Sequence, residues 1–188
     1  MTRGIVFLEE RSAFHLAEAV AARLGLADQL LFIPHDGKAD LMRSAPRKIE
    51  AWRHPADVRF VIARDNDGSD CADLKLKLLA QIPRPFHDRT KVRLVMQELE
   101  SWYLGDPSAL VAAGYLDPRM AESHGRKRKY AEPDRLTNAK QEFARWVGAK
   151  GKIAAAQSIG PHLDEKRGRS TSFRHFVEAL TWAAAERA

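Results

Sequence analysis

Acidic residues follow a short apolar segment in the middle of the chain, where they could bind a divalent cation. Asp65 and Asp67 stand two residues apart after Phe60-Val61-Ile62-Ala63, and Asp70 follows them. Neighbouring carboxylates repel one another unless a cation offsets their charge, and carboxylate oxygens are ligands that suit Mg²⁺ and Mn²⁺. The pattern therefore predicts a Mg²⁺ or Mn²⁺ site. The alternative interpretation is an acidic turn whose aspartates cap a helix and face water.

Two other apolar segments are also followed by acids. Glu9 comes after the first apolar segment of the chain, and Glu98 and Glu100 come after the fourth. The carboxyl ends of parallel strands meet at one edge of a sheet, which is where open α/β folds bind ligands. We therefore expect the three groups of acids to converge. The alternative is a solvated strand end at Glu9, with Glu10 able to take its place, and an ordinary acidic helix start at Glu98 and Glu100.

Glu98 and Glu100 cannot both face such a site from one helix. Residues two apart on a helix are separated by about 200° of rotation. Glu98 is nearer the end of the preceding segment. We therefore expect Glu98 to be the metal ligand of the two, with Glu10, Asp70 and Glu100 as further candidate acids.

Strand-like and helical segments alternate over the first 106 residues. The strand-like segments are short, apolar and rich in β-branched residues, and helical apolar spacing follows each of them. The predicted strands are residues 4–8, 30–33, 60–63 and 92–96, and the predicted helices are 12–24, 40–52, 72–80 and a stretch starting at 97–104. Ser12 and Asp70 stand at helix starts as N-caps. This alternation predicts a mainly parallel sheet of about four strands with helices on both faces.

Strand signals cease after residue 106. Helices are expected at residues 107–113, 138–147 and 173–186, and loops at 124–134, 158–162 and 168–172. No repeat or low-complexity linker interrupts the chain, so we predict one domain over residues 1–188. It comprises an α/β core (1–106) and a helical, basic extension (107–188) packed on it.

Positive charge collects in the second half of the chain. The net charge is +6, and residues 117–175 carry 14 Lys and Arg against 7 Asp and Glu. A basic segment beside an acidic centre suits a polyanionic partner, and nucleic acid is the partner expected here. The candidate residues for binding the phosphate backbone of the nucleic acid are Lys127, Arg128, Lys129, Arg169 and Arg174. The alternative for each of them is ordinary solvated surface.

Cysteine content and hydropathy limit the possible kinds of site and the expected location of the protein. Cys71 is the one cysteine, which excludes an internal disulfide and a cysteine-rich zinc site and makes a reducing cytoplasm the expected location. No apolar run approaches the ~20 residues that span a bilayer, so no membrane partner is expected. The sequence contains no P-loop, G-x-G-x-x-G or G-x-S-x-G motif, and its histidines lack the spacing of zinc ligands.

The motifs together resemble the Toprim fold of topoisomerases, primases and old-type nucleases. More closely, the chain is similar to a bacterial Toprim-like family of unassigned function that is often encoded beside AAA ATPases and linked to phage defence. The resemblance rests on residues 8–12, 34–40, 64–71, 98–106 and 170–179, which together reach over nearly the full length. The chain departs from the family's Glu-Gly-Pro-Ser entry, because it carries Glu9-Glu10-Arg11-Ser12.

The resemblance implies a Rossmann-like Toprim fold and a set of roles. Asp65 and Asp67 would hold Mg²⁺ or Mn²⁺, and Glu9 would act as general acid/base or as a further ligand. The implied function is metal-dependent cleavage of DNA or RNA phosphodiesters, as in a phage-defence nuclease. Two alternatives stay open: a non-catalytic Toprim-like regulator that binds an AAA ATPase, and a phosphotransfer enzyme acting on a small nucleotide.

Overall fold

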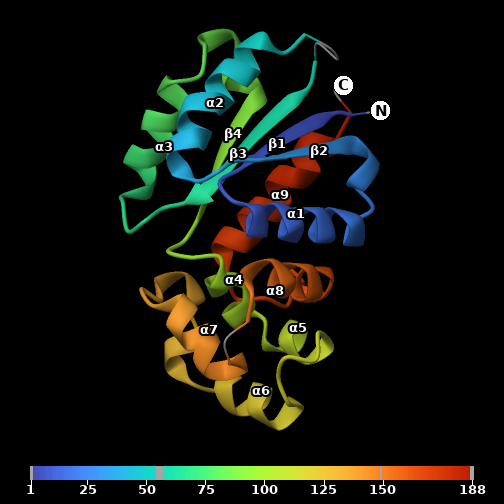
Figure 1. Cartoon of the computed structure of the whole chain (residues 1–188), viewed down its shortest axis with the longest axis vertical. Helices are drawn as coiled ribbons and strands as arrows, with labels where there is room; N and C mark the ends of the chain where they lie inside the picture. Colours follow the sequence, from blue (N-terminus) through green and yellow to red (C-terminus); the bar gives the residue numbers. More distant parts are fainter. Residues whose placement is uncertain (1, 54–56, 149, 187–188) are drawn as a thin grey trace.

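A four-stranded sheet forms the centre of the computed structural model, which describes residues 2–53, 57–148 and 150–186 (Figure 1). All neighbouring strands are parallel, in the order β2-β1-β3-β4. The strands are β1 (Gly4–Leu8), β2 (Leu30–Pro34), β3 (Arg59–Asp65) and β4 (Thr90–Val95). Leu8 pairs with Ala63 and Asp65 with Val95, so β1, β3 and β4 end close to one another. The predicted α/β class with a parallel sheet of four strands is confirmed.

Side chains alternate along the strands and divide the core into two layers. Val6, Leu8, Val61 and Ala63 pack towards α1 (Arg11–Arg23) and α9 (Thr171–Ala184). Ile5, Phe7, Phe60 and Ile62 pack towards α2 (Lys38–Ala51), and β4 packs against α3 (Cys71–Ala80). Figure 1 shows these two layers on either side of the sheet. All five residues of β1 are buried, as expected of a central strand covered on both faces.

The rest of the chain forms a helical part below the sheet in Figure 1. Its helices are α4 (Glu100–Gly105), α5 (Pro107–Ala112), α6 (Pro118–Gly125), α7 (Ala139–Val147) and α8 (Lys152–Ile159). α8 packs on α1, and α7 packs on α4. Short 3-10 helices are η1 (Ala27–Gln29), η2 (Arg84–Arg89), η3 (Arg128–Tyr130), η4 (Pro133–Arg135) and η5 (Gly160–His162). Over the described ranges, no helix has the length and apolar character needed to cross a membrane.

The structure corrects several predicted elements. The helices α6 and α8 were not expected, and residues 124–134 and 158–162 contain helical turns where loops were predicted. α8 has the sequence KIAAAQSI, whose three polar residues do not share one helix face, so it lacks the period of an amphipathic helix. α1 begins at Arg11 rather than after Ser12, whose hydroxyl contacts the Glu10 carboxylate. β3 extends to Asp65, so Arg64 and Asp65 belong to the strand itself.

Asp106 joins the start of α5 to the segment that precedes α9. Its carboxylate is 2% exposed and accepts two hydrogen bonds of 2.8 Å from the Arg167 guanidinium. It also accepts from the backbone amides of Ala109 and Asp164, and so caps α5. A buried carboxylate with this many donors leaves several unsatisfied groups when it is removed.

We predict that Asp106→Ala lowers the free energy of unfolding by about 2–4 kcal/mol, because it removes a helix cap and leaves the Asp164 amide and the half-exposed Arg167 guanidinium without their buried acceptor. Asp117→Ala is the matched control, since Asp117 also precedes a proline and caps a helix but does so at an exposed position. Its loss should cost about 0.5–2 kcal/mol. Urea unfolding of both variants measures the difference. Equal losses would contradict the role given to Asp106.

Candidate functional site

The predicted acids of β1 and β3 meet at the carboxyl edge of the sheet. The backbone amide of Asp65 lies 3.3 Å from Glu9 Oε2, although the two residues are 56 apart in the chain. The end of β4 is tied in as well, because Asn66 Oδ1 accepts a 2.7 Å hydrogen bond from the amide of Gln97. Asp67 and Gln97 both adopt positive φ angles, of 50° and 64°. Such backbone is uncommon for residues other than glycine and is concentrated at functional sites.

Glu9 and Asp67 are paired with cations of the protein itself. The Arg64 guanidinium, 1% exposed, places Nη2 2.6 Å from Asp67 Oδ2 and Nε 3.6 Å from Glu9 Oε2. Its Nε also donates to the Asp65 carbonyl oxygen at 2.8 Å. The Lys38 ammonium reaches Asp67 Oδ2 at 2.8 Å from the start of α2. We call Glu9, Arg64, Asp67 and Lys38 the paired cluster.

Asp65, unlike Glu9 and Asp67, has no cationic partner among the described residues. Among the described residues, no donor or cation contacts its carboxylate oxygens within hydrogen-bond or ion-pair distance. Asp65 lines a small cavity whose other charged lining residues are Glu9, Glu10 and Arg64. Burial, together with the charges of Glu9, Glu10, Asp67 and Glu100, raises the pKa of Asp65 to about 8. The carboxylate form of Asp65 is therefore short of positive charge, which a bound cation would supply.

Glu100 and Glu10 lie on the same side as Asp65. Glu100 is 7% exposed, and burial is the main reason that its pKa lies above its ordinary value. Glu10 pairs with Lys152 of α8 at 3.3 Å. Burial would lower the pKa of Lys152, but Glu10 and Glu100 outweigh it and raise that pKa. We call Asp65, Glu10, Glu100 and Lys152 the open cluster, since three carboxylates share one lysine there.

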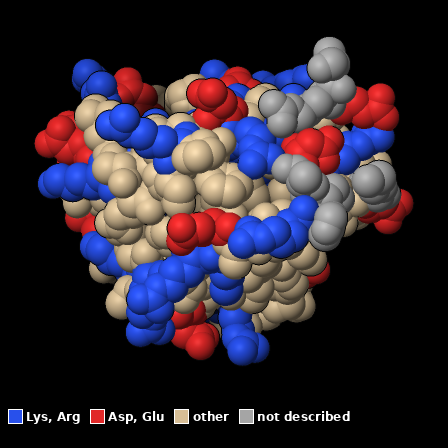
Figure 2. All heavy atoms as spheres, turned by 90° about the horizontal axis from the view of Figure 1, so that it is seen from above, with Lys and Arg blue, Asp and Glu red and all other residues tan. Residues whose placement is uncertain are grey.

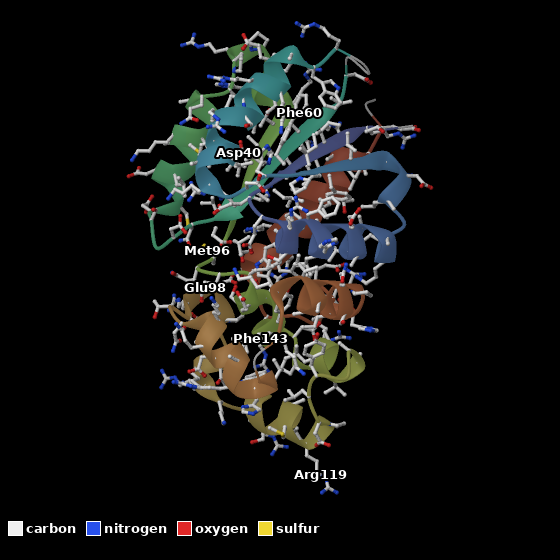
Figure 3. All side chains as sticks on the ribbon, viewed as in Figure 1. Asp40, Phe60, Met96, Glu98, Arg119 and Phe143 are labelled. Carbon is white, nitrogen blue, oxygen red and sulfur yellow. The ribbon has the colours of Figure 1, made fainter. Side chains whose placement is uncertain are left out.

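Two predicted acids have structural partners. Glu98 Oε2 accepts a 2.8 Å hydrogen bond from the amide of Lys140, so Glu98 caps the first turn of α7. Figure 3 shows Glu98 on the segment that follows β4, beside the helical part. Asp70 Oδ1 accepts from the amides of Ala72 and Asp73 at 2.9 Å, which confirms its predicted N-cap. A metal-binding role for either residue stays a prediction, and the geometry favours Glu100 over Glu98.

The predicted basic residues fall into two groups. Lys129 and Arg169 hold the fold: Lys129 pairs with buried Glu142 at 2.7 Å, and Arg169 donates to the Gly125 carbonyl. Lys127, Arg128 and Arg174 form the other group, although all five residues are exposed to solvent. The face seen from above in Figure 2 mixes positive and negative side chains, so the net charge is not gathered into one patch there. A nucleic-acid contact by these residues stays a prediction.

A cavity of about 550 Å³ adjoins the same edge of the sheet. It lies between α3, the end of β4, η4 and the start of α9, and includes Cys71 and Met96. Its positively charged lining residues are Lys75, Arg93, Arg135 and Arg169. Sequence reasoning identified only Arg169 among them, because the other three are scattered through segments whose proximity depends on the fold.

Sequence reasoning also missed Arg64, Lys38 and Lys152. A charge inside an apolar strand was a usable signal for Arg64, because such a residue must find a buried partner. Lys152 carried no local signal, since its contact with Glu10 joins residues 142 apart.

The side chains of the site are of the types that bind divalent cations, but they are not spaced closely enough to surround one. Across the part of the chain that the structure describes, no three His, Cys, Asp or Glu side chains are arranged closely enough to hold a metal ion. The donor set of the open cluster is nevertheless all carboxylate, as Mg²⁺ and Mn²⁺ prefer. Among the described residues no donor or cation contacts the Asp65 carboxylate, and burial is the main reason that its pKa is raised to about 8.

Three comparisons with known proteins place this geometry in context. Residues 7–181 match the family described as Domain of unknown function (DUF4276). The C-terminal region of the Burkholderia pseudomallei OLD protein has a similar structure, with a TM-score of 0.59, 19% identity and coverage of 98% of this chain and 100% of that one. The C-terminal region of the Xanthomonas campestris pv. campestris OLD protein gives a TM-score of 0.54, 15% identity and coverage of 98% and 96%. No curated protein matches the sequence.

We predict that Asp65→Asn stabilises the metal-free protein at alkaline pH. The folded-state pKa of Asp65 is raised, so the stability contributed by its protonated form is present below about pH 4 and is lost as pH rises through about 8. Asparagine cannot ionise. In EDTA at pH 8.5 the variant should melt ~3 °C or more above wild type, which corresponds to about 1 kcal/mol for a domain of this size.

The two melting temperatures should converge towards pH 4, and Mn²⁺ should narrow the gap at pH 8.5. Asp73→Asn removes an exposed acid of α3 and serves as the control, with no pH-dependent difference expected. If the difference in melting temperature between Asp65→Asn and wild type is the same at every pH in this range, the Asp65 carboxylate is not uncompensated.

Proposed function

Because this chain belongs to the family described as Domain of unknown function (DUF4276) and has the fold of the OLD C-terminal regions, we propose that it is a Toprim-type, Mg²⁺- or Mn²⁺-dependent nuclease. The observation that carries the proposal is the uncompensated carboxylate of Asp65 at the carboxyl edge of the sheet. It lies beside Glu9, the acid that follows the first strand. Nucleic acid, DNA or RNA, is the proposed substrate.

The open cluster would hold the cation through Asp65, with Glu10 and Glu100 as further donors. When bound, a divalent ion supplies positive charge to a phosphodiester as negative charge develops on its oxygens. Glu9 is placed to take or return a proton at its carboxylate, because its pKa is raised by burial, partly opposed by Arg64. The apolar neighbours Leu99, Trp102 and Phe176 exclude water from the inner side of Asp65.

The cationic cavity beside the site suits the substrate's backbone. Phosphates repelled by the acids need positive charge nearby, and the four basic residues of this cavity outnumber its two acids, Glu132 and Asp134. Arg93 keeps its charge while donating to the His175 carbonyl at 2.9 Å. We propose that one strand of nucleic acid follows this cavity towards Asp65.

One observation favours a second candidate function. In the paired cluster, Arg64 pairs with Glu9 and Asp67, and Lys38 pairs with Asp67, so half of the predicted metal site already has cationic partners from the protein. That arrangement also suits a non-catalytic Toprim-like regulator that acts on a partner such as an AAA ATPase. Activity of the purified chain alone distinguishes the two candidates.

We predict that the purified protein cleaves plasmid DNA or a structured RNA in Mn²⁺ or Mg²⁺ and not in EDTA. Asp65→Asn should lower the cleavage rate at least ~100-fold, because it removes the charged donor while keeping the shape of the side chain. Asp73→Asn is the matched control and should cleave at the wild-type rate. Cleavage that survives in Asp65→Asn would reject this site, and absence of cleavage by wild type would favour the regulator.

We predict opposite effects for the two glutamates that follow β4. Glu100→Gln should lower the cleavage rate about tenfold or more with little change in melting temperature, since it removes a donor of the open cluster. Glu98→Gln should keep the rate and lower stability by about 0.5–2 kcal/mol, because a neutral amide caps α7 less well. A slow Glu98→Gln variant together with a fully active Glu100→Gln variant would show that Glu98, and not Glu100, is the ligand.

A further inference from the structure

Arg64 occupies a place in this site that is unusual for a cationic residue. It is the largest of the fully buried side chains, and it lies among acids that would otherwise be candidate metal ligands. Its guanidinium spans Asp67, the Asp65 carbonyl and Glu9 at 2.6, 2.8 and 3.6 Å. A buried guanidinium needs such partners, because an unpaired buried charge is strongly unfavourable.

The pleat of β3 separates this guanidinium from the Asp65 carboxylate. Consecutive residues of a strand point to opposite faces, and Ile62 and Phe60 assign the face of Arg64 to the α2 layer. Ala63 assigns the face of Asp65 to the layer of α1 and α9. Accordingly, the contacts of the Arg64 guanidinium in the described part of the chain go to Asp67, Glu9 and the Asp65 carbonyl, and none goes to the Asp65 carboxylate oxygens.

We propose that Arg64 takes the place of a second cation, so that the site binds one divalent ion, on the Asp65 face, and Asp67 is not a ligand. The inference rests on the proposed function only in assuming that a divalent ion binds at all. It assigns the two sides of the site different sources of positive charge: the open cluster receives an ion from solution, and the paired cluster carries its own.

Two physical arguments exclude a second ion between Glu9 and Asp67. An ion there would lie within a few ångströms of a buried guanidinium, where like charges repel strongly in a medium of low polarisability. The alternative is to displace the guanidinium from Asp67, which would leave its buried charge with one ionic contact, the longer one to Glu9, besides its hydrogen bond to the Asp65 carbonyl. Lys38 adds a further positive charge at the same carboxylate.

The fixed cation has a chemical role beside the proposed reaction. A guanidinium next to the edge of the sheet adds positive potential where a phosphate would approach, and a chelator cannot remove it. Arg64 acts through the acids that it holds, so we describe it as a positioning residue. It fixes the Glu9 carboxylate against the amide of Asp65 and keeps Asp67 away from the ion.

The test is the number of Mn²⁺ ions bound per chain, measured by titration calorimetry and by electron paramagnetic resonance of free Mn²⁺. Wild type should bind one ion. Asp65→Asn should weaken its affinity about tenfold or more, and Asp67→Asn should change it less than about threefold. Asp67 is 44% exposed in its side chain, so this variant is expected to fold, which melting temperature verifies.

Substitution of Arg64 itself gives the complementary result. Arg64→Met removes the charge and frees Glu9 and Asp67, so the count should rise to two ions per chain. Arg64→Lys keeps the charge and should keep the count at one. A count that stays at one in a folded Arg64→Met protein would overturn the inference, and the Asp67→Asn result decides it if Arg64→Met does not fold.

Failures of the two proposals look different in this experiment. Two ions in wild type, or an affinity at least tenfold weaker in Asp67→Asn, would overturn the role of Arg64 and leave the nuclease proposal standing. One ion in wild type without nucleic-acid cleavage would support the role of Arg64 and reject the nuclease. Wild type that binds no Mn²⁺ would overturn both.

Discussion

The alternation of side chains along β3 governs the whole acidic edge. Arg64 and Asp65 are neighbours in the chain, yet the strand sends one into the α2 layer and the other into the layer of α1 and α9. One side of the edge is therefore neutralised by the protein, while the other retains a carboxylate whose pKa rises to about 8. Both conditions follow from two consecutive residues in an otherwise apolar strand.

The helical part completes the open side of the site. α4 follows β4 closely and carries Glu100 into the interior, and α8 packs on α1 and carries Lys152 to Glu10. The position of α7 is fixed by the buried carboxylate of Glu142, which accepts hydrogen bonds from Lys129 and Tyr130. Those hydrogen bonds lower the pKa of Glu142 to about 2, so its contribution to stability is present above pH 4.5 and is lost as pH falls towards 2.

The sequence allowed the fold class and part of the site to be predicted. Short apolar segments ending in acids indicate parallel strands, and parallel strands bring Glu9 and Asp65 to one edge. Arg64 was not predicted because its charge sits at the end of an apolar run, where it is easily mistaken for the beginning of a loop. Glu100 was ranked below Glu98 because that choice depends on where α4 begins, and helix boundaries are poorly fixed by pattern alone. The contact of Lys152 with Glu10 depends on the packing of α8, whose sequence has no amphipathic pattern that would indicate which face is buried.

The ends of the segment between residues 105 and 169 lie side by side. The Arg169 amide donates to the Gly105 carbonyl at 3.0 Å, and Asp106 clamps Arg167 next to it. Gly105 suits this junction, because a Cβ there would lie 3.2 Å from the Ser170 nitrogen. The segment between residues 105 and 169 is thus a long insertion whose two ends are held next to each other. The entropic cost of closing a loop grows only with the logarithm of its length. The part of this insertion around α5 and α6 can therefore lengthen or shorten without moving the strands. Relatives that differ in size around α5 and α6 can therefore keep the same acidic edge.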